Sequence, residues 1–308
     1  GHEPITASAP LRACLAGEDL DWLGPHTSVC AAVNTRTTVS SQPAPGLEVI
    51  RSPMIPMAWS RLCPSQIPIP LFSSRGELVG GGLASSSSLL LASVRVISAV
   101  AGLGMSNSEE VRAAYEIEYG FFNGGGMDHV AIAQGGATVF TGRSTGVPPA
   151  ERLPWYNRWK ILIIGTNERK DTAEHIRAVR AQLEVGSTRL ETYIREVSAA
   201  AEDCAAAIRS GDLATLRWCM ETCHELMRGL QSMSTPKIEL IRDIATRNGI
   251  PGLKLTGAGS GGSLVAVIDE AEQDQIGLVE TTSQARRHGL AVSAALTDVT
   301  SSGVVGAR

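Results

Sequence analysis

The stretch that decides the fold reads Gly80-Gly81-Gly82-Leu83-Ala84-Ser85-Ser86-Ser87-Ser88 and continues without a break into the apolar run LLLASVRVISAV at 89–100. A flexible Gly/Ser linker would not lead into such a run, so we expect a buried helix that ends near Gly102. Glycines let a backbone approach an anion closely, and the first N–H groups of a helix point at it. Serine hydroxyls there can bind phosphate oxygens or Mg²⁺. Because no Gly-Lys-Ser/Thr follows the glycines, this is not a Walker A loop.

A second glycine turn, Gly257-Ala258-Gly259-Ser260-Gly261-Gly262, matches the letters of the G-x-G-x-x-G dinucleotide fingerprint. That fingerprint requires a helix after it, within a βαβ unit. Here the next residues, SLVAVID at 263–269, predict a strand instead. The segment therefore predicts a glycine loop between two strands, suited to close packing against phosphates or another domain.

Two acidic turns complete the candidate chemistry. Gly17-Glu18-Asp19-Leu20-Asp21 places three carboxylates in four positions, which costs stability unless they are solvated, paired or used. Carboxylates are good acceptors for the hydroxyl groups of polyols. Asp128 follows a glycine turn at 124–126, between a predicted helix and a predicted strand VAIAQ at 130–134, where it could reach into a cleft or act as an ordinary turn former.

The composition limits the classes of function. A chain of 308 residues can hold two domains, and its 43% hydrophobic and 19% charged residues indicate a folded protein. A formal charge of −4 and a pI near 5.9 argue against a nucleic-acid partner. No apolar run reaches 18 residues, so no membrane segment is expected. The N-terminal sequence lacks a secretory signal, and the six cysteines lack CxxC pairs, which predicts reduced thiols in a cytoplasmic protein.

The chain divides near residue 150. Before it, strands are expected at 9–16 and 29–40, a loop-rich stretch with two or three short strands at 41–79, and a helix at about 107–119 opened by Asn107 or Ser108. After it, we expect a strand at 159–167, helices at about 171–184, 187–209, 212–229, 236–248 and 270–288, and strands at 253–257, 263–269 and 290–296. This predicts an antiparallel sheet. Cys219, Cys223 and His224 are closely spaced, but a structural helix face is favoured there over a metal site.

Taken in this order, the elements resemble the GHMP kinase superfamily, which includes galacto-, homoserine, mevalonate and phosphomevalonate kinases. The resemblance rests on three motifs: Pro10-Leu11-Arg12 through Glu18-Asp19, Gly82-Leu83-Ala84-Ser85-Ser86-Ser87, and Lys254-Leu255-Thr256 through Gly262. It implies an α+β fold of two domains, an N-terminal ribosomal-protein-S5-like domain at 3–152 and a C-terminal ferredoxin-like domain at 153–308, with the active site in the cleft between them.

Galactokinase and related sugar kinases are the nearest branch. Glu18-Asp19-Leu20-Asp21 is similar to their Glu-His-Thr-Asp segment, Gly125-Gly126-Met127-Asp128 resembles their Gly-Ile-Met-Asp turn, and residues 114–118 resemble a helix of heptose phosphate kinases. Asp19 stands where galactokinases have His, and His129 where they commonly have Gln. Ala13-Cys14 replaces Val-Asn. These departures put galactose itself in doubt as the substrate.

The resemblance also implies roles for residues, with ATP and Mg²⁺ as cofactors. Asp128 would accept the proton of the attacking hydroxyl, and Arg12 would lie beside it as the second catalytic residue. Glu18, Asp19, Asp21, Gly126, Gly257 and Ala258 would bind the acceptor. Gly80, Gly81, Gly82, Leu83, Ala84, Ser85, Ser86, Ser87, Ser88, Gly257, Gly259 and Ser260 would bind ATP. Ser86 would reach Mg²⁺ together with Glu118, narrowly favoured, or Glu116.

We therefore expect an ATP-dependent kinase, a monomer or homodimer, that phosphorylates a hydroxyl of a sugar, cyclitol, heptose or uronic acid. One alternative is a mevalonate-type kinase or decarboxylase, since Asn34-Thr35-Arg36-Thr37 is faintly similar to a mevalonate kinase segment. The three carboxylates at 18–21 argue against it, because they would repel an anionic acceptor. A further alternative is a ligand sensor that binds ATP without catalysis, although Arg12, Ser86 and Asp128 are all present.

Overall fold

The computed structural model describes residues 3–63, 67–76, 81–168, 171–257 and 262–307. The elements of the first half are β1 (Thr6–Ala16), α1 (Leu20–Leu23), β2 (Thr27–Ser40), β3 (Glu48–Val49), α2 (Met54–Leu62), β4 (Ser73–Gly76), α3 (Ser85–Val100), α4 (Asn107–Phe122), α5 (Met127–Gln134), β5 (Ala137–Thr141) and β6 (Ala150–Leu153). Those of the second half are β7 (Trp159–Gly165), α6 (Thr172–Glu184), α7 (Thr188–Ser210), α8 (Leu213–Gln231), α9 (Pro236–Arg247), β8 (Lys254–Thr256), β9 (Ser263–Asp269), the 3₁₀ helix η1 (Glu270–Glu272), α10 (Leu278–Arg287), β10 (Ser293–Thr297) and β11 (Val305–Gly306). None of the described helices is both long and apolar enough to cross a bilayer.

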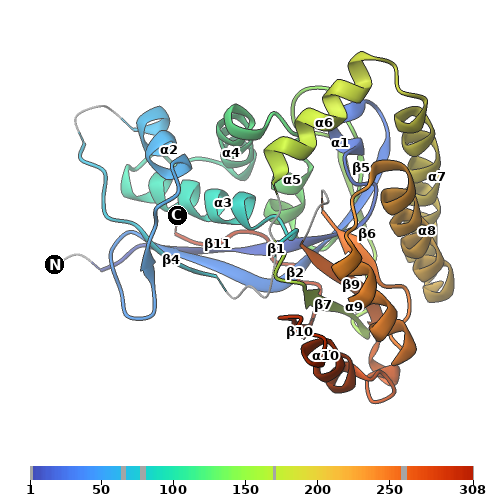
Figure 1. Cartoon of the computed structure of the whole chain (residues 1–308). Coiled ribbons are helices and arrows are strands. Elements are labelled where there is room, and N and C mark those ends of the chain that lie inside the picture. Colours follow the sequence, from blue (N-terminus) through green and yellow to red (C-terminus); the bar gives the residue numbers. More distant parts are fainter. Residues whose placement is uncertain (1–2, 64–66, 77–80, 169–170, 258–261, 308) are drawn as a thin grey trace.

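The first sheet is built on β1 and β2, which pair antiparallel along their whole length. On the other side of β2, β4 takes one end and β5 the other, while β3 and β6 extend these two branches. Helices α2 to α5 lie together on one face of this sheet, and α3 and α5 pack directly on β1 and β2 (Figure 1). This packing brings the N-terminal ends of α3 and α5 close to the end of β1.

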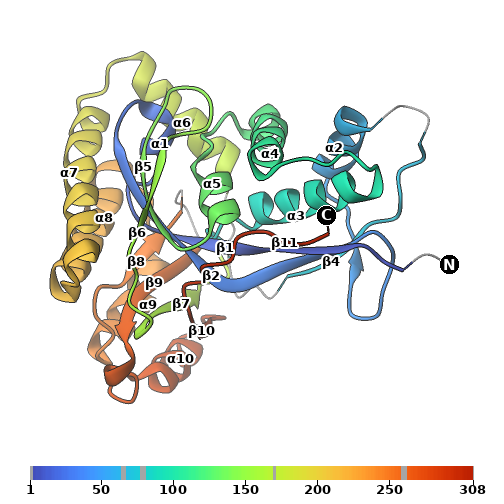
Figure 2. The same ribbon diagram turned by 180° about the vertical axis from the view of Figure 1, so that it is seen from behind.

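The second sheet has the order β10-β7-β9-β8, and every pair in it is antiparallel, as predicted. Helix α8 packs on β8 and β9 and helix α10 packs on β10, while α7 packs on α8 and on β1 and β2, so that one apolar core joins both sheets. The boundary at 152 and 153 stays a prediction. It falls within β6, and the C-terminal strand β11 returns to pair with β1 in the first sheet (Figure 2).

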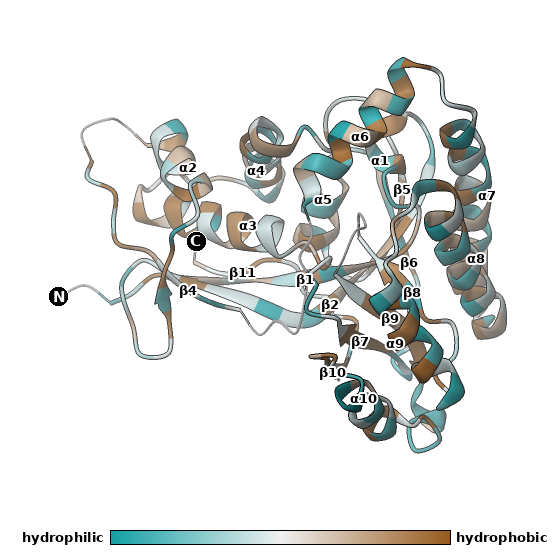
Figure 3. Cartoon of the chain, viewed as in Figure 1, coloured by the Kyte–Doolittle hydropathy of each residue, from teal (hydrophilic) through white to brown (hydrophobic). Residues whose placement is uncertain are grey.

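Helices α6 to α9 begin where the sequence predicts them because each carries a capping side chain. Asp171, Ser187, Asp212 and Thr235 each accept a hydrogen bond from the backbone N–H three residues later. Apolar residues then recur at helical spacing, and Figure 3 shows both brown and teal around α7 and α8, as amphipathic packing requires. Cys219 and Cys223 are buried within this face, which agrees with the structural interpretation.

Four local predictions are wrong. The helix predicted at 270–288 is divided into η1 (Glu270–Glu272) and α10 (Leu278–Arg287), because Gly277 is a poor helix former and interrupts the run. The segment 130–134 belongs to helix α5, not to a strand, because a short apolar run gives no reliable period and this one packs beneath α3 and α4 as a helix. The loop-rich stretch contains helix α2, whose Pro56 lies in the first turn, where proline needs no N–H. Helix α4 is capped by Ser106, in a capping box with Glu109, not by Asn107 or Ser108.

Candidate active site

Three segments far apart in the sequence meet at the end of β1. The N–H of Arg12 donates to Leu83 O at 3.0 Å, and the N–H of Cys14 donates to Thr256 Oγ1 at 2.8 Å. Gly82 has a φ of +81°, and a Cβ on it would collide with the carbonyl oxygen of Thr256. Only glycine allows this approach, so the two glycine segments are brought together by direct backbone packing.

Arg12 and Asp128 form the centre of the site. The Arg12 Nε donates to Asp128 Oδ1 at 2.6 Å and its Nη2 to Oδ2 at 3.1 Å, a two-pronged pair, while Nη1 donates to Gly82 O at 2.8 Å. The Arg12 side chain is 7% exposed and that of Asp128 is 28% exposed, so the carboxylate faces the open side. The guanidinium therefore balances the charge of Asp128 and fixes it beside the glycine loop.

The N-terminus of α3 opens at the predicted phosphate loop. Ala84 occupies the N-cap position in a left-handed conformation (φ 58°) and has no side-chain oxygen to bond the first N–H groups of the helix. An anion could take that place. Not every predicted loop residue is exposed, because Leu83 lies in the core and Ser88 Oγ donates to Ala9 O at 3.1 Å inside the fold.

The structure separates the two candidate metal ligands. Ser87 Oγ donates to Glu118 Oε1 at 2.8 Å, and Ser86 Oγ lies 3.4 Å from Glu118 Oε2. Glu116 points elsewhere and forms a surface ion pair with Arg61 at 3.0 Å. A carboxylate and two hydroxyls gathered at a helix N-terminus are hard oxygen donors, which fit Mg²⁺.

His129 lies behind this group and is 2% exposed. Its Nε2 is 3.6 Å from Glu118 Oε2, too far for a hydrogen bond. Burial alone would lower the pKa of His129, but the nearby carboxylates of Glu118, Asp128 and Asp21 raise it on balance.

Glu18 is not a free carboxylate. Lys254, which is fully buried, places its Nζ 2.7 Å from Glu18 Oε1 and also contacts Oε2, and it donates to Cys14 O at 3.1 Å and Leu255 O at 2.7 Å. Burial would lower the pKa of Lys254, yet Glu18 raises it overall. Glu18 and Lys254 thus form a buried ion pair that joins β1 to β8.

Asp19 and Asp21 have different surroundings from Glu18 and from each other. His175 Nε2 lies 2.7 Å from Asp19 Oδ2, with side chains 8% and 3% exposed. Asp21 packs so tightly on Gly125 that a Cβ added to Gly125 would overlap the Asp21 carboxylate. Burial, and then the charges of Asp128 and Asp19, raises the pKa of Asp21 to about 7.

One cavity collects most of these groups. Its wall includes Arg12, Cys14, Glu18, Asp19, Asp21, Glu118, Asp128, His129 and Gly257, with an apolar side formed by Trp22, Phe122 and Ile176. Gly126 instead packs against Tyr115 and Val147, while its neighbours Gly124 and Gly125 line the cavity. The predicted residues Gly80, Ala258, Gly259 and Ser260 lie outside the described residues.

Sequence reasoning missed three residues of this site. Lys254 was quoted only as part of a glycine motif, His129 only as a departure from galactokinases, and His175 not at all. A lysine inside the short apolar strand at 254–256 was a usable signal, because a buried ammonium requires a partner. No sequence signal marked His175, since it lies on an ordinary amphipathic helix.

His224, Glu225 and Glu239 lie close together, but this cluster does not suit a metal because His224 is already hydrogen-bonded at both ring nitrogens. The Nδ1 of His224 accepts a hydrogen bond from the Leu255 N–H at 3.0 Å, so the proton of the neutral ring lies on Nε2, which is 2.9 Å from Glu239 Oε2. Burial, then Arg242, lowers the pKa of His224 to about 4, in keeping with the neutral ring. Both ring nitrogens are therefore occupied by protein hydrogen bonds.

Comparison with known proteins agrees with this geometry. Residues 62–136 match the GHMP kinases N terminal domain, and residues 204–278 match the GHMP kinases C terminal domain. A mevalonate kinase from Methanocaldococcus jannaschii is 24% identical over 80% of this chain and 70% of its own length. A mevalonate kinase from Gibberella zeae is 28% identical over 47% of this chain, and a Mycobacterium tuberculosis galactokinase is 26% identical over 62% of it. This chain spans 30% of the former protein and 61% of the latter.

Solved structures extend the likeness of fold to the whole chain. L. major mevalonate kinase with R-mevalonate superposes with a TM-score of 0.75 at 20% identity, covering 98% of both chains. Lactococcus lactis galactokinase with galactose gives 0.76 at 17% identity, covering 98% of this chain and 95% of its own. With both domains matched in order, the chain belongs to the GHMP kinases.

Proposed function

We propose that this protein transfers the γ-phosphoryl group of ATP to a hydroxyl of a sugar-like polyol. The observation that carries the proposal is the Arg12–Asp128 pair, which lies in the cavity wall and bonds the glycine loop before α3. This arrangement supports a carboxylate that binds the acceptor beside a loop that binds phosphates. Phosphoryl transfer needs little more than such positioning and charge balance.

Asp128 acts on the acceptor hydroxyl. Both of its oxygens accept from Arg12, but each carboxylate oxygen has a further lone pair that can take a hydrogen bond from the acceptor. As the hydroxyl oxygen bonds the γ-phosphorus and ADP leaves, the hydroxyl proton passes to Asp128. Arg12 holds the carboxylate in place and faces the charge that develops between the two substrates.

The phosphates are held from the other side. The N–H groups that open α3 and the glycines at 81–82 would bind the β- and γ-phosphates. Ser86 and Glu118 would hold Mg²⁺, with Ser87 positioning Glu118 through its 2.8 Å hydrogen bond. Bound there, Mg²⁺ would neutralise phosphate charge.

The acceptor cavity supports a polyhydroxylated substrate. Asp19 and Asp21 offer hydroxyl acceptors, and Trp22 and Phe122 offer an apolar surface of the kind that packs against the C–H face of a sugar ring. The departures from galactokinases at Asp19 and His129 support an acceptor other than galactose.

A mevalonate-type activity is a second candidate, favoured by a specific observation. Glu18 is paired with Lys254, and Asp19 is bonded to His175, so only Asp21 remains to repel an anion by itself. The repulsion expected from three carboxylates is thus smaller than the sequence predicts.

The test is ADP release from Mg-ATP with sugars, heptose phosphates, uronic acids, cyclitols and mevalonate. We expect turnover with a polyol and its loss, by at least about 10²-fold, in Asp128→Asn. Asp243→Asn, a change on the surface of α9, is the control and should retain turnover. Normal turnover in Asp128→Asn would refute its role. Turnover with mevalonate alone would favour the second candidate, and ATP binding without turnover would favour a sensor.

A further inference from the structure

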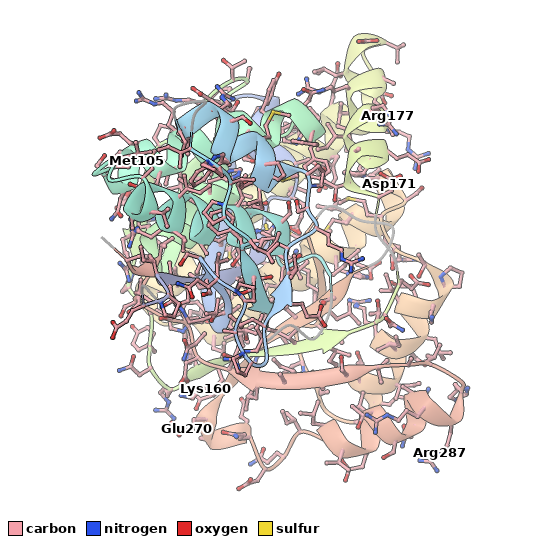
Figure 4. The ribbon with its side chains drawn as sticks, turned by 90° about the vertical axis from the view of Figure 1, so that its left-hand side faces the viewer. Met105, Lys160, Asp171, Arg177, Glu270 and Arg287 are labelled. Carbon is pink, nitrogen blue, oxygen red and sulfur yellow. The ribbon has the colours of Figure 1, made fainter. Side chains whose placement is uncertain are left out.

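Helix α6 forms one wall of the acceptor cavity, although it belongs to the second half of the chain. Thr172 and Ile176 line the cavity, one turn apart on the same face. Arg177, on another side of the helix, points away from the molecule (Figure 4). The helix therefore presents a defined face to the acidic turn at 18–21.

His175 lies on the inner face and contacts Asp19 directly. The Nε2–Oδ2 distance is 2.7 Å and both side chains are nearly fully buried. Because an ionised carboxylate can only accept, the ring donates this hydrogen bond. Asp19 itself has a φ of 71°, an uncommon conformation for a residue other than glycine, so its carboxylate direction depends on such a partner.

Three more contacts hold α6 against α1 and against the glycine turn that follows α4. The Arg180 guanidinium lies 4.6 Å from the centre of the Trp22 ring and donates to Asn123 O. Ile176 packs against Gly124, where even a Cβ would come within 3.2 Å. The position of His175 is therefore set by the helix, and the His175–Asp19 bond is not a chance surface contact.

The charges around the cavity are matched in pairs. These pairs are Arg12 with Asp128, Lys254 with Glu18, His175 with Asp19, and His129 near Glu118. Within the described residues, Asp21 is the one carboxylate of the acidic turn that has no ion pair. An anionic acceptor would have to displace a carboxylate from its cation and would also meet Asp21.

We propose that His175 is a positioning residue that orients Asp19 toward the acceptor. Because the His175 ring is bonded to the Asp19 carboxylate, it is not available to an anionic ligand, and the cavity is selective for neutral polyols over their anionic analogues. The proposal rests on the kinase function proposed above. His175 acts through Asp19 and does not touch the reacting atoms.

The test compares His175→Ala, His175→Gln and the matched control Arg177→Ala, which changes the outer face of the same helix. With the best neutral polyol of the panel above, His175→Ala should raise the KM for the acceptor about tenfold and leave kcat and the KM for ATP within about twofold. Gln can donate to Asp19 and should recover most of the loss. Arg177→Ala should match the parent protein.

Selectivity is read with the best neutral polyol of that panel and with the uronic acid of the same carbon skeleton, which are a neutral and an anionic form of one acceptor. Asp19→Asn frees the His175 ring from its carboxylate, so the ratio of kcat/KM for the acid to that for the neutral polyol should rise about tenfold. An unchanged ratio, equal effects of His175→Ala on both KM values and kcat, or no recovery with Gln would overturn the proposal.

The two proposals fail separately. If no acceptor is phosphorylated, the kinase function fails. Calorimetric titration of the same polyols into the parent protein and into His175→Ala still measures how much His175 contributes to polyol affinity. Binding that His175→Ala leaves unchanged, or binding to neither protein, would then overturn the role of His175.

Discussion

Replacing Lys254 by Met should destabilise the protein severely, because it leaves the buried carboxylate of Glu18 without its cation. The Lys254 side chain is 0% and that of Glu18 is 2% exposed. Removing one partner of such a buried pair costs about 3–5 kcal/mol. Lys254 also donates to the carbonyls of Cys14 and Leu255, so the cost should lie in the upper part of that range.

The assay is urea unfolding followed by fluorescence and circular dichroism, with a matched surface pair as control. Lys160 bonds Asp298 at 2.5 Å, but Asp298 is 60% exposed and solvent screens the pair, so Lys160→Met should destabilise the protein far less than Lys254→Met. The double variant Lys254→Met/Glu18→Gln removes both charges and should recover at least about 1 kcal/mol relative to Lys254→Met.

The reasoning would be refuted if Lys254→Met cost no more than Lys160→Met, or if Glu18→Gln added its full single-variant cost to that of Lys254→Met. Either result would mean that the two side chains are not coupled in the folded protein. Loss of soluble protein for Lys254→Met with recovery in the double variant would support the pair.

Three further predictions concern the site. Glu118→Gln should raise the Mg²⁺ concentration needed for half-maximal ADP release by at least about tenfold, while Glu116→Gln, on the surface pair with Arg61, should not; equal effects would contradict the metal assignment. Gly82→Ala should raise the KM for ATP and lower stability by more than about 1 kcal/mol, since its Cβ would meet Thr256 O at a φ of +81°, and a variant as stable and active as the parent would show that the loops are not in contact. Burial raises the pKa of Asp21 to about 7, against roughly 4 in the unfolded chain, so between these values the native state binds a proton that the unfolded chain has lost, and the protein loses stability as pH rises from about 4 to 7. The free energy of unfolding of Asp21→Asn, minus that of the parent, should therefore increase from pH 5 to pH 7.5. A constant difference would rule out the raised pKa.

The sequence alone was enough for the elements whose signals are local. Capping residues and helical periodicity located α6 to α9 to within a few residues, and the strand after Gly262 excluded the dinucleotide fold. The order of the three motifs led to the GHMP kinases, and both matched domains confirm that family and fold.

Local signals failed where tertiary packing decides. Val130 to Gln134 is too short and too apolar for its period to distinguish a helix from a strand, so its position on the sheet below α3 and α4 settled the matter. Local signals also could not tell which of Glu116 and Glu118 faces the serines of α3, because both lie on one helix two residues apart; Glu118 does, and its role as a metal ligand stays a prediction.

The three carboxylates at 18–21 show most clearly which properties depend on the sequence and which depend on tertiary packing. Their sequence predicted an acidic pocket, but their partners come from β8 and α6, 236 residues from Glu18 and 156 residues from Asp19. Charge balance in a buried site is a property of the groups that surround it in space. The sequence therefore determined which chemical groups this protein possesses, and only the tertiary structure decided which of them are paired and which remain to meet a substrate.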